Sequence, residues 1–244
     1  MLTAPERETV AAVLGAYARG WFPMADPERA GVGLESRAAD LGWYDPDPRG
    51  VLPIGRGFHV PRRLAKTARS GLFRLTSDLA FDAVVFACAD PGREGAWIDG
   101  RIAGLFNLLH RAGHAHSVEA WRPIETIDGH ERGLPLIEPD LGGVRTFGGV
   151  PHALVGGLYG LALAGLFAGE SMFHRADLGG TDAGKLCLVE TERRLRAGGF
   201  VLFDTQMCSR VTEAFGCREI LRGVYRRRLA AAMRTQGVWA TDEN

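Results

Sequence analysis

Residues 153–175 read ALVGGLYGLALAGLFAGESMFHR, and this stretch decides the fold. The small residues 162–165 interrupt its apolar run and predict two β-strands that meet in a turn. The mostly apolar part, residues 153–168, is too short to span a membrane, contains several glycines and is soon followed by Glu170. We therefore expect an antiparallel hairpin inside a globular domain.

The rest of the chain alternates between helical and extended patterns. Residues 3–19 predict a helix, because Thr3 and Glu6 have the spacing of a capping box and Pro5 suits the first turn. Residues 21–57 are rich in Pro, Gly and Asp and predict irregular, turn-rich structure. Further helices are expected within 61–70, 81–88, 98–109, 181–197 and after 222, and further strands within 73–78, 116–121 and 200–206.

This mixture of helices and strands predicts the α+β class with a mixed sheet. A change of character at residue 58 predicts two domains, a small N-terminal domain (residues 1–57) and a larger one (residues 58–244). Residues 123–152 are polar, rich in Gly and Pro and without periodicity, so we expect a long loop inserted into the second domain. Such a loop gates a site, binds a partner or is simply a tolerated surface insertion.

The charge is balanced overall but uneven along the chain. The 29 basic and 29 acidic side chains exclude a uniformly basic nucleic-acid coat and still permit a local basic face. Arg62, Lys66 and Arg69 share one face of an expected helix, as contact with a row of phosphates requires. A solvated helix face explains this pattern as well, but a second cluster favours a polyanion site. That cluster comprises Arg218, Arg222, Arg226, Arg227 and Arg228.

Two short polar motifs follow apolar strands. In VLFDTQ, strand alternation places Asp204 and Gln206 on the same face, where they would orient a polar substrate. In LFAGESMF, Glu170 lies between Phe167 and Met172, and a partly buried carboxylate there would bind a cationic amine in an apolar pocket. Taken singly, each motif has a simpler explanation: Asp204 caps the next turn, and Glu170 is a surface residue at a strand end.

Other side-chain patterns narrow the function further. The four cysteines form no C-x-x-C pair, and we interpret them as reduced thiols of a cytosolic protein. His110, His114 and His116 straddle a helix end and a strand start, so they do not share a face and we expect no metal site. The N-terminal residues MLTAPERETV lack the basic and apolar regions of a secretory signal.

Several motifs occur in a fixed order along the chain: GWFPMA, WYDPDPR, FHVPRRLAKTARSG, LHRAGHAHSVEAW, LVGGLYG, LFAGESMFHR and FDTQ. In this order they resemble the bacterial leucyl/phenylalanyl-tRNA–protein transferases, and the resemblance extends over residues 14–229. Its most specific part is GESMF followed by a strand that ends in D-x-Q.

The resemblance implies an enzyme that transfers Leu or Phe, with Met as a further candidate, from aminoacyl-tRNA to the N-terminal Arg or Lys of an acceptor protein. The product is an N-degron, which marks the acceptor for proteolysis. The resemblance also implies a GNAT-like acyltransferase fold for the second domain. Aminoacyl-tRNA is then the co-substrate in place of coenzyme A, with no cofactor and no metal. We expect a cytoplasmic monomer without membrane contacts.

The same resemblance assigns roles residue by residue. Glu170, Asp204 and Gln206 match the catalytic polar residues of the family: Gln206 would accept a hydrogen bond from the acceptor amine, Asp204 would hold it, and Glu170 would bind the α-ammonium of the transferred residue. Which group removes the amine proton stays open, with water and a tRNA hydroxyl as candidates. The residues that match the amino-acid pocket are Trp121, Leu158, Phe167 and Met172, and those that match the tRNA-binding segment are Arg62, Lys66 and Arg69.

The chain departs from the family pattern at three places. The segment before the first helix is short, Met24 stands where an aromatic residue is common, and residues 123–152 replace a short hairpin. Two other functions therefore stay open. The first is a related acyltransferase that uses coenzyme A or makes a cell-wall peptide. Coenzyme-A users carry the pyrophosphate loop Q/R-x-x-G-x-G/A, which this sequence lacks. A non-catalytic tRNA-binding module would tolerate the loss of Asp204 or Gln206.

Overall fold

The computed structural model describes residues 1–25, 41–90, 92, 97–128 and 143–240. The first helix confirms its predicted cap: the hydroxyl of Thr3 accepts from the backbone N–H of Glu6, and the Glu6 carboxylate accepts from the N–H of Thr3. The helices of the described residues are α1 (Ala4–Tyr17), α2 (Arg62–Arg69), α3 (Phe81–Cys88), α4 (Gly100–Arg111), α5 (Ala183–Ala197), α6 (Arg210–Ala214) and α7 (Arg222–Ala232).

One mixed sheet dominates the structure. Its strands are β3 (Arg49–Leu52), β4 (Arg74–Ser77), β5 (Ala115–Pro123), β6 (Val144–Phe147), β7 (Val150–Leu163), β8 (Leu166–His174), β9 (Leu202–Gln206) and β10 (Arg218–Ile220). They lie in the order β10-β3-β9-β8-β7-β5-β4, with β6 paired to β7. Within it, β8 and β9 run parallel, whereas the other pairs are antiparallel. A separate antiparallel pair joins β1 (Phe22–Met24) to β2 (Gly42–Tyr44).

The apolar stretch forms the antiparallel hairpin β7–β8, as its sequence predicts. The turn falls at the small residues, where Ala164 adopts a positive φ of 51°. Gly160 in β7 allows close packing, because a Cβ at this position would collide with the carbonyl oxygen of Ala168 and the ring of Phe167. The small residues therefore set both the turn and the space that Phe167 occupies.

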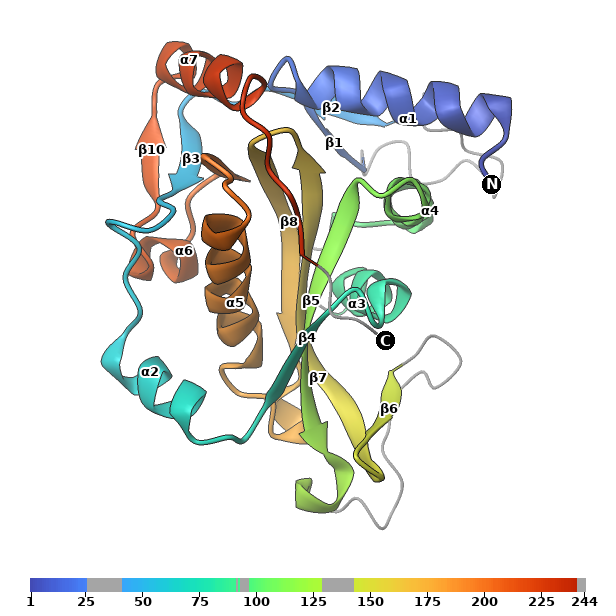
Figure 1. Cartoon of the computed structure of the whole chain (residues 1–244), viewed down its shortest axis with the longest axis vertical. Helices are drawn as coiled ribbons and strands as arrows, with labels where there is room; N and C mark the ends of the chain where they lie inside the picture. The colour runs from blue at the N-terminus through green and yellow to red at the C-terminus, as the bar shows by residue number, and fades with distance from the viewer. Residues whose placement is uncertain (26–40, 91, 93–96, 129–142, 241–244) are drawn as a thin grey trace.

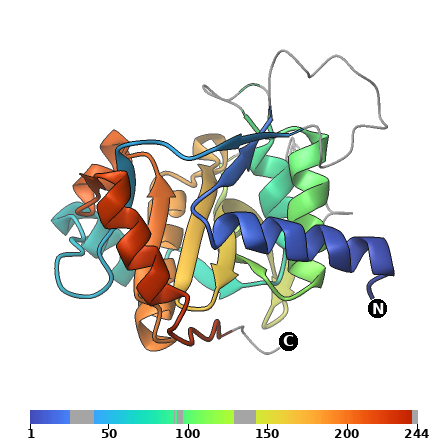
Figure 2. The ribbon, with the colours of Figure 1, turned by 90° about the horizontal axis from the view of Figure 1, so that it is seen from above.

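Helices cover both faces of the sheet (Figure 1). On one face α3 and α4 enclose an apolar cluster that includes Phe106, Trp121 and Tyr159. On the other face α5 packs against β5, β7 and β8 over a cluster that includes Phe167 and Phe203. Helices α1 and α7 lie across one end of the sheet (Figures 1 and 2). From there Tyr17 of α1 reaches Glu170 in β8, and Tyr225 of α7 reaches Asp204 in β9.

The α+β class with a mixed sheet is confirmed, and two local expectations change. Residues 22–24, 42–44 and 49–52 form the strands β1, β2 and β3, where we expect irregular structure, and β3 lies between β9 and β10. The division of the chain into domains at residue 57 stays a prediction, although β3 joins the large sheet from its N-terminal side. In the expected loop, residues 144–147 and 150–152 are strand, because β6 pairs with the first half of β7; residues 129–142 lie outside the described residues.

Candidate active site

A cavity lies where the two parallel strands part. Strands β8 and β9 pair only from Leu166 opposite Leu202 to Ala168 opposite Asp204, although β8 continues to His174. Beyond this point the unpaired ends enclose a cavity of about 200 Å³. Its walls consist of Leu158, Gly169, Glu170, Ser171, Met172, Leu188, Phe203, Thr205, Gln206, Met207, Ser209 and Thr212. The cavity is smaller than the roughly 300–1,000 Å³ of drug-sized ligand sites, so it suits a single small side chain.

Glu170 is the acidic residue of this wall. Its side chain is buried, and the hydroxyl of Tyr17 from α1 donates to Oε1 at 2.8 Å. No partner for Oε2 is present within the described ranges. Burial raises the pKa of Glu170 to about 8, although the hydrogen bond from Tyr17 opposes this effect. Near pH 7 this carboxyl group is therefore mainly neutral.

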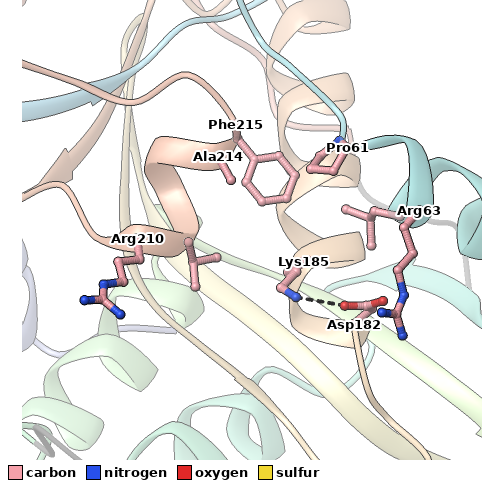
Figure 3. A pocket seen from close by; sticks show the side chains of 9 residues that line it. Pro61, Arg63, Asp182, Lys185, Arg210, Ala214 and Phe215 are labelled. Carbon is pink, nitrogen blue, oxygen red and sulfur yellow. Dashed lines mark hydrogen bonds and ion pairs between the residues drawn. The ribbon is translucent and has the colours of Figure 1, made fainter.

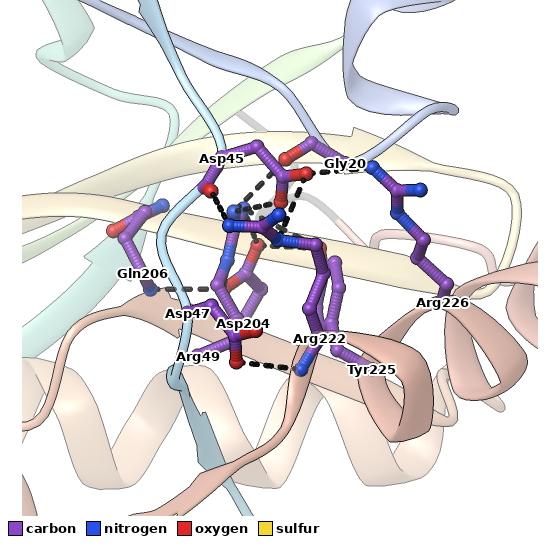
Figure 4. A network of polar contacts seen from close by, with 9 residues as sticks. All are labelled: Gly20, Asp45, Asp47, Arg49, Asp204, Gln206, Arg222, Tyr225 and Arg226. Carbon is purple, nitrogen blue, oxygen red and sulfur yellow. Dashed lines mark hydrogen bonds and ion pairs between the residues drawn. The ribbon is translucent and has the colours of Figure 1, made fainter.

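Asp204 has a different environment, although it lies on the neighbouring strand. Arg49 donates two hydrogen bonds to its carboxylate, from Nε at 2.9 Å and from Nη2 at 2.6 Å. The hydroxyl of Tyr225 from α7 donates at 2.7 Å, and the backbone N–H of Gln206 donates at 2.8 Å (Figure 4). Asp204 is fully buried and does not belong to the cavity wall. With these donors its oxygens are satisfied by protein, as a buried carboxylate requires.

Arg49 is itself enclosed. Its remaining nitrogen donates to the carbonyl oxygen of Gly20 at 2.9 Å, and its guanidinium lies over the rings of Phe22 and Tyr225. Burial disfavours the charged guanidinium, but Asp204 outweighs this effect and raises the pKa of Arg49. The pair joins β3 to β9 and ties both strands to α7. It therefore fixes the strand end on which Gln206 lies.

Gln206 closes β9 in an unusual backbone conformation. Its φ is 56°, the left-handed region that costs a non-glycine residue free energy and that surrounding contacts must hold in place. The hydrogen bond from its N–H to Asp204 supplies such a contact. Figure 4 shows the Gln206 side chain pointing away from the Arg49–Asp204 pair. The side chain lines the cavity with a buried Nε2 that has no partner in the described part of the chain.

The residues expected in the amino-acid pocket separate into two groups. Leu158 and Met172 line the cavity together with Glu170 and Gln206. Phe167 lies behind the wall, with its ring centroid 5.6 Å from Phe203 and 5.1 Å from Trp239. Trp121 faces the α3–α4 side of the sheet, where its Nε1 donates to the hydroxyl of Thr76 at 2.7 Å. The structure thus places both residues outside the cavity wall. Trp121 faces the other side of the sheet, whereas Phe167 lies on the cavity side of the sheet, behind Phe203.

The basic residues expected to contact tRNA lie on α2. Arg62, Lys66 and Arg69 are exposed, and none of them forms an ion pair with a residue that the structure describes. Leu64 is the buried residue of this helix and anchors it to the protein. The second arginine cluster is different, since Arg222 and Arg226 pair with Asp45. Part of that cluster is therefore structural, and α2 keeps the free basic face.

Sequence reasoning missed Arg49, Tyr17 and Tyr225 as parts of the site. Arg49 is the last residue of WYDPDPR, one of the motifs that carry the family resemblance, but the resemblance assigns no role to this arginine. Tyr17 matches the apolar stripe of α1, and its hydroxyl gives no sign in the sequence of a partner 153 residues away. Tyr225 has no distinguishing local pattern. The signal available for these residues is the motif that contains Arg49.

Two of the three histidines considered for a metal site have hydrogen-bonding partners in the protein. Nδ1 of His116 lies 2.7 Å from the Asp78 carboxylate, and Nδ1 of His110 lies 2.8 Å from the carbonyl oxygen of Ala115. Among the described residues, no three His, Cys, Asp or Glu side chains are grouped so as to hold a metal ion. The four cysteines are free thiols. In the same residues, no helix combines the length and apolar character needed to cross a membrane.

Comparisons with known proteins identify the family of this chain. The family model described as leucyl/phenylalanyl-tRNA protein transferase matches residues 51–131 and 149–230, and its gap falls within the expected insertion. The leucyl/phenylalanyl-tRNA–protein transferase of Caulobacter vibrioides NA1000 is 42% identical over 94% of this chain and 88% of its own length. Those of Phenylobacterium zucineum and Akkermansia muciniphila are 44% and 38% identical, over 91% and 95% of this chain and 82% and 99% of their own lengths.

The comparison with solved structures includes a neighbour of low sequence identity. The crystal structure of FemX aligns with a TM-score of 0.49 and 11% sequence identity, over 88% of this chain and 70% of that chain. The family assignment rests on the sequence comparisons, which extend over nearly the whole chain. This chain belongs to the leucyl/phenylalanyl-tRNA–protein transferase family.

Proposed function

We propose that this chain transfers Leu or Phe from aminoacyl-tRNA to the N-terminal Arg or Lys of an acceptor protein. The observation that carries this proposal is the cavity between β8 and β9. It combines an apolar wall, which includes Leu158 and Met172, with a carboxyl group and a carboxamide that each keep a buried polar atom free for a ligand. An aminoacyl group presents the matching parts: an apolar side chain, an α-amine and an ester carbonyl.

The reaction needs positioning more than activation. The ester that links the amino acid to tRNA is already reactive, so the acceptor amine attacks its carbonyl carbon, a C–N bond forms and the C–O bond to the ribose breaks. The amine loses a proton and the ribose hydroxyl gains one. Holding the two reactants together and stabilising the oxyanion supply most of the required rate enhancement. Neither ATP nor a redox cofactor takes part in this balance.

Gln206 is proposed to assist at the carbonyl. A carboxamide is barely basic, so it does not serve as the proton acceptor. Its Nε2 is buried without a partner among the described residues, and an N–H donor aimed into the cavity would stabilise the oxyanion. The sequence leads us to expect Gln206 to accept from the amine; the free Nε2 favours donation instead. Asp204 then acts as a positioning residue, through the N–H of Gln206 and through Arg49.

Glu170 is proposed to recognise the α-amine of the transferred residue. Without a bound cation, a pKa of about 8 keeps the carboxyl group mostly protonated near pH 7. An α-ammonium group placed at Oε2 would favour the ionised form, because an opposite charge lowers a carboxyl pKa. Binding of aminoacyl-tRNA in its ammonium form should then release a proton from Glu170. A surface carboxylate, already ionised, would not give this release.

Several further properties belong to the same proposal. The C-terminal part of the chain would have a GNAT-like acyltransferase fold, since its mixed sheet parts between two parallel strands at the cavity. Aminoacyl-tRNA would be the co-substrate in the absence of any cofactor or metal. The face of α2 that bears Arg62, Lys66 and Arg69 would contact the tRNA. The enzyme would act as a cytoplasmic monomer, and its product would be an N-degron.

The first test is transfer of radiolabelled Leu or Phe from charged tRNA to a peptide that begins with Arg. A peptide that begins with Ala is the control, and neither ATP nor coenzyme A is added. We expect label on the Arg peptide alone. Binding of tRNA without transfer would favour a tRNA-binding module, and loss of both would separate this chain from the activity of its family.

A further inference from the structure

A second hollow lies beside the cavity, between α2, the first turn of α5 and α6. It has a volume of about 320 Å³, and its apolar floor includes Leu64, Val211 and Phe215. Basic side chains surround it: Arg63 from α2, Lys185 from α5 and Arg210 from α6. Figure 3 shows Arg63 and Arg210 at opposite ends, with Lys185 between them. We call this hollow the α2–α6 groove.

The charges of the α2–α6 groove are only partly compensated by protein. Lys185 pairs with Asp182 at 2.8 Å, and Asp182 is the acidic residue of the groove wall. Arg63 and Arg210 are exposed, and neither forms an ion pair with a residue that the structure describes. The chain as a whole has no net charge, so this concentration of cations is local. Such a groove favours an anionic ligand and repels the cationic N-terminus of an acceptor peptide.

The groove and the cavity lie on two sides of the same short helix. Ser209 and Thr212, at the start of α6, line the cavity, whereas Arg210 and Val211 line the groove. The two hollows are related along α5 in the same way, because Lys185 lines the groove and Leu188, about one turn later, lines the cavity. An extended ligand that leaves the cavity over α6 therefore enters the groove.

We propose that the α2–α6 groove binds the acceptor arm of aminoacyl-tRNA, with Arg63, Lys185 and Arg210 in contact with its phosphates. This inference rests on the proposed function, because it takes the aminoacyl end of the tRNA to lie in the cavity. RNA backbones bind along basic grooves, and an apolar floor accommodates sugar and base surfaces. The groove shares α2 with the expected tRNA face, because Arg63 and Leu64 line the groove while Arg62, Lys66 and Arg69 are exposed on the same helix.

The first experiment removes single charges. Arg210→Ala and Arg63→Ala should each raise the KM for leucyl-tRNA about three- to tenfold and leave the KM for the acceptor peptide unchanged. Each variant should also reduce the steepness of a plot of log binding constant for tRNA against log salt concentration by about 0.7–0.9, the value for one lost phosphate contact. The matched control is Arg111→Ala, since Arg111 is an exposed arginine at the end of α4, which covers the other face of the sheet (Figure 1). Equal effects of all three variants would overturn the proposal, because they would reflect overall charge rather than the groove.

The second experiment fills the groove without changing its charge. Ala214→Trp places an indole on an exposed groove residue, and it should raise the KM for leucyl-tRNA while the acceptor-peptide KM stays the same. A second readout uses an RNA hairpin that contains only the acceptor stem and the 3′ end and carries no amino acid. Its affinity for Ala214→Trp should fall together with the affinity for leucyl-tRNA. Undiminished binding of that hairpin by Ala214→Trp would show that the groove is empty in the complex. If the wild-type chain binds tRNA but transfers nothing, the proposed function fails, and the hairpin still tests the groove.

Discussion

Glu170 and Asp204 are buried residues with carboxyl groups on neighbouring strands, but they differ in their hydrogen-bond donors and in the charge beside them. Asp204 receives two hydrogen bonds from Arg49, one from Tyr225 and one from the backbone of Gln206. Glu170 receives one from Tyr17, and its Oε2 has no partner in the described residues. An arginine compensates the charge of Asp204, whereas no cation lies within hydrogen-bonding distance of Glu170 in these residues.

This difference separates two tasks that a buried carboxyl group can perform. A carboxylate whose oxygens are all satisfied by protein has no capacity left for a ligand, and its value is structural. A carboxyl group with a free oxygen and a pKa of about 8 can exchange a proton and can accept a new charged partner. We therefore interpret the Arg49–Asp204 pair as the support of the site and Glu170 as the group that meets substrate.

The strongest test of this division is Asp204→Ala. It should abolish transfer, to below roughly one-hundredth of the wild-type rate, and leave tRNA binding intact, because the α2 face is a separate surface. It should also lower the free energy of unfolding by about 3–5 kcal/mol, since Arg49 would remain buried without its partner. Single-turnover transfer, filter binding of tRNA and urea unfolding measure the three quantities.

Two further variants make this test specific. Asp204→Asn keeps the size of the side chain and should still lose most of the activity, because the bidentate bond with Arg49 needs a carboxylate. Asp177→Ala breaks an exposed ion pair with Arg175 and should change the free energy of unfolding by less than about 1 kcal/mol. Near-wild-type transfer by Asp204→Ala would contradict the supporting role of this residue.

The second test concerns the pH dependence of stability. The native state keeps the Glu170 proton up to a pKa of about 8, whereas an unfolded chain releases it near 4.5. Between these values the native state binds more protons, so the free energy of unfolding should fall as pH rises, by about 4 kcal/mol in total from this one residue. Glu170→Gln cannot titrate and should flatten this part of the curve. Urea unfolding at several pH values between 4.5 and 8 measures the difference.

The same variant connects stability to function. Glu170→Gln removes the negative charge available to an α-ammonium group, so transfer should fall at least about tenfold. The proton released on binding of leucyl-tRNA, measured by calorimetry in buffers of different ionisation enthalpy, should disappear. The contrary outcome is that the free energy of unfolding depends on pH in the same way for Glu170→Gln and the wild-type protein. The pKa of Glu170 would then be ordinary, and the contrast with Asp204 would disappear.

The sequence predicts much of this site because its motifs are local. The hairpin β7–β8, the strand that ends in Asp204 and Gln206 and the helix that bears Arg62 follow from apolar periodicity and turn residues. The partners are different. Arg49 lies 155 residues from Asp204, and no local pattern encodes a contact over that separation. Strand β3 was missed for a related reason: it has four residues, flanked by prolines, and pairing within the sheet stabilises it.

Strand alternation also fails at a definite place. It predicts Asp204 and Gln206 on one face, but the positive φ of Gln206 turns its side chain away from Asp204 and into the cavity wall. A left-handed glutamine is not encoded by propensity, because tertiary contacts impose it. The exception therefore occurs at the residue that we place beside the reacting carbonyl.

The smallest expected effect comes from Tyr17→Phe. The Tyr17 hydroxyl donates to Oε1 of Glu170 and holds its pKa below the value that burial alone would give. Its removal should raise that pKa further and move the corresponding limb of the transfer pH profile upward by about half to one pH unit, as expected for a hydrogen bond worth about 0.5–1.5 kcal/mol. The control is Tyr44→Phe, since Tyr44 is exposed. An unchanged pH profile for Tyr17→Phe would mean that Tyr17 contributes packing alone. Burial would then set the pKa of Glu170 without help from a hydrogen-bond donor, and the contrast with Asp204 would be sharper.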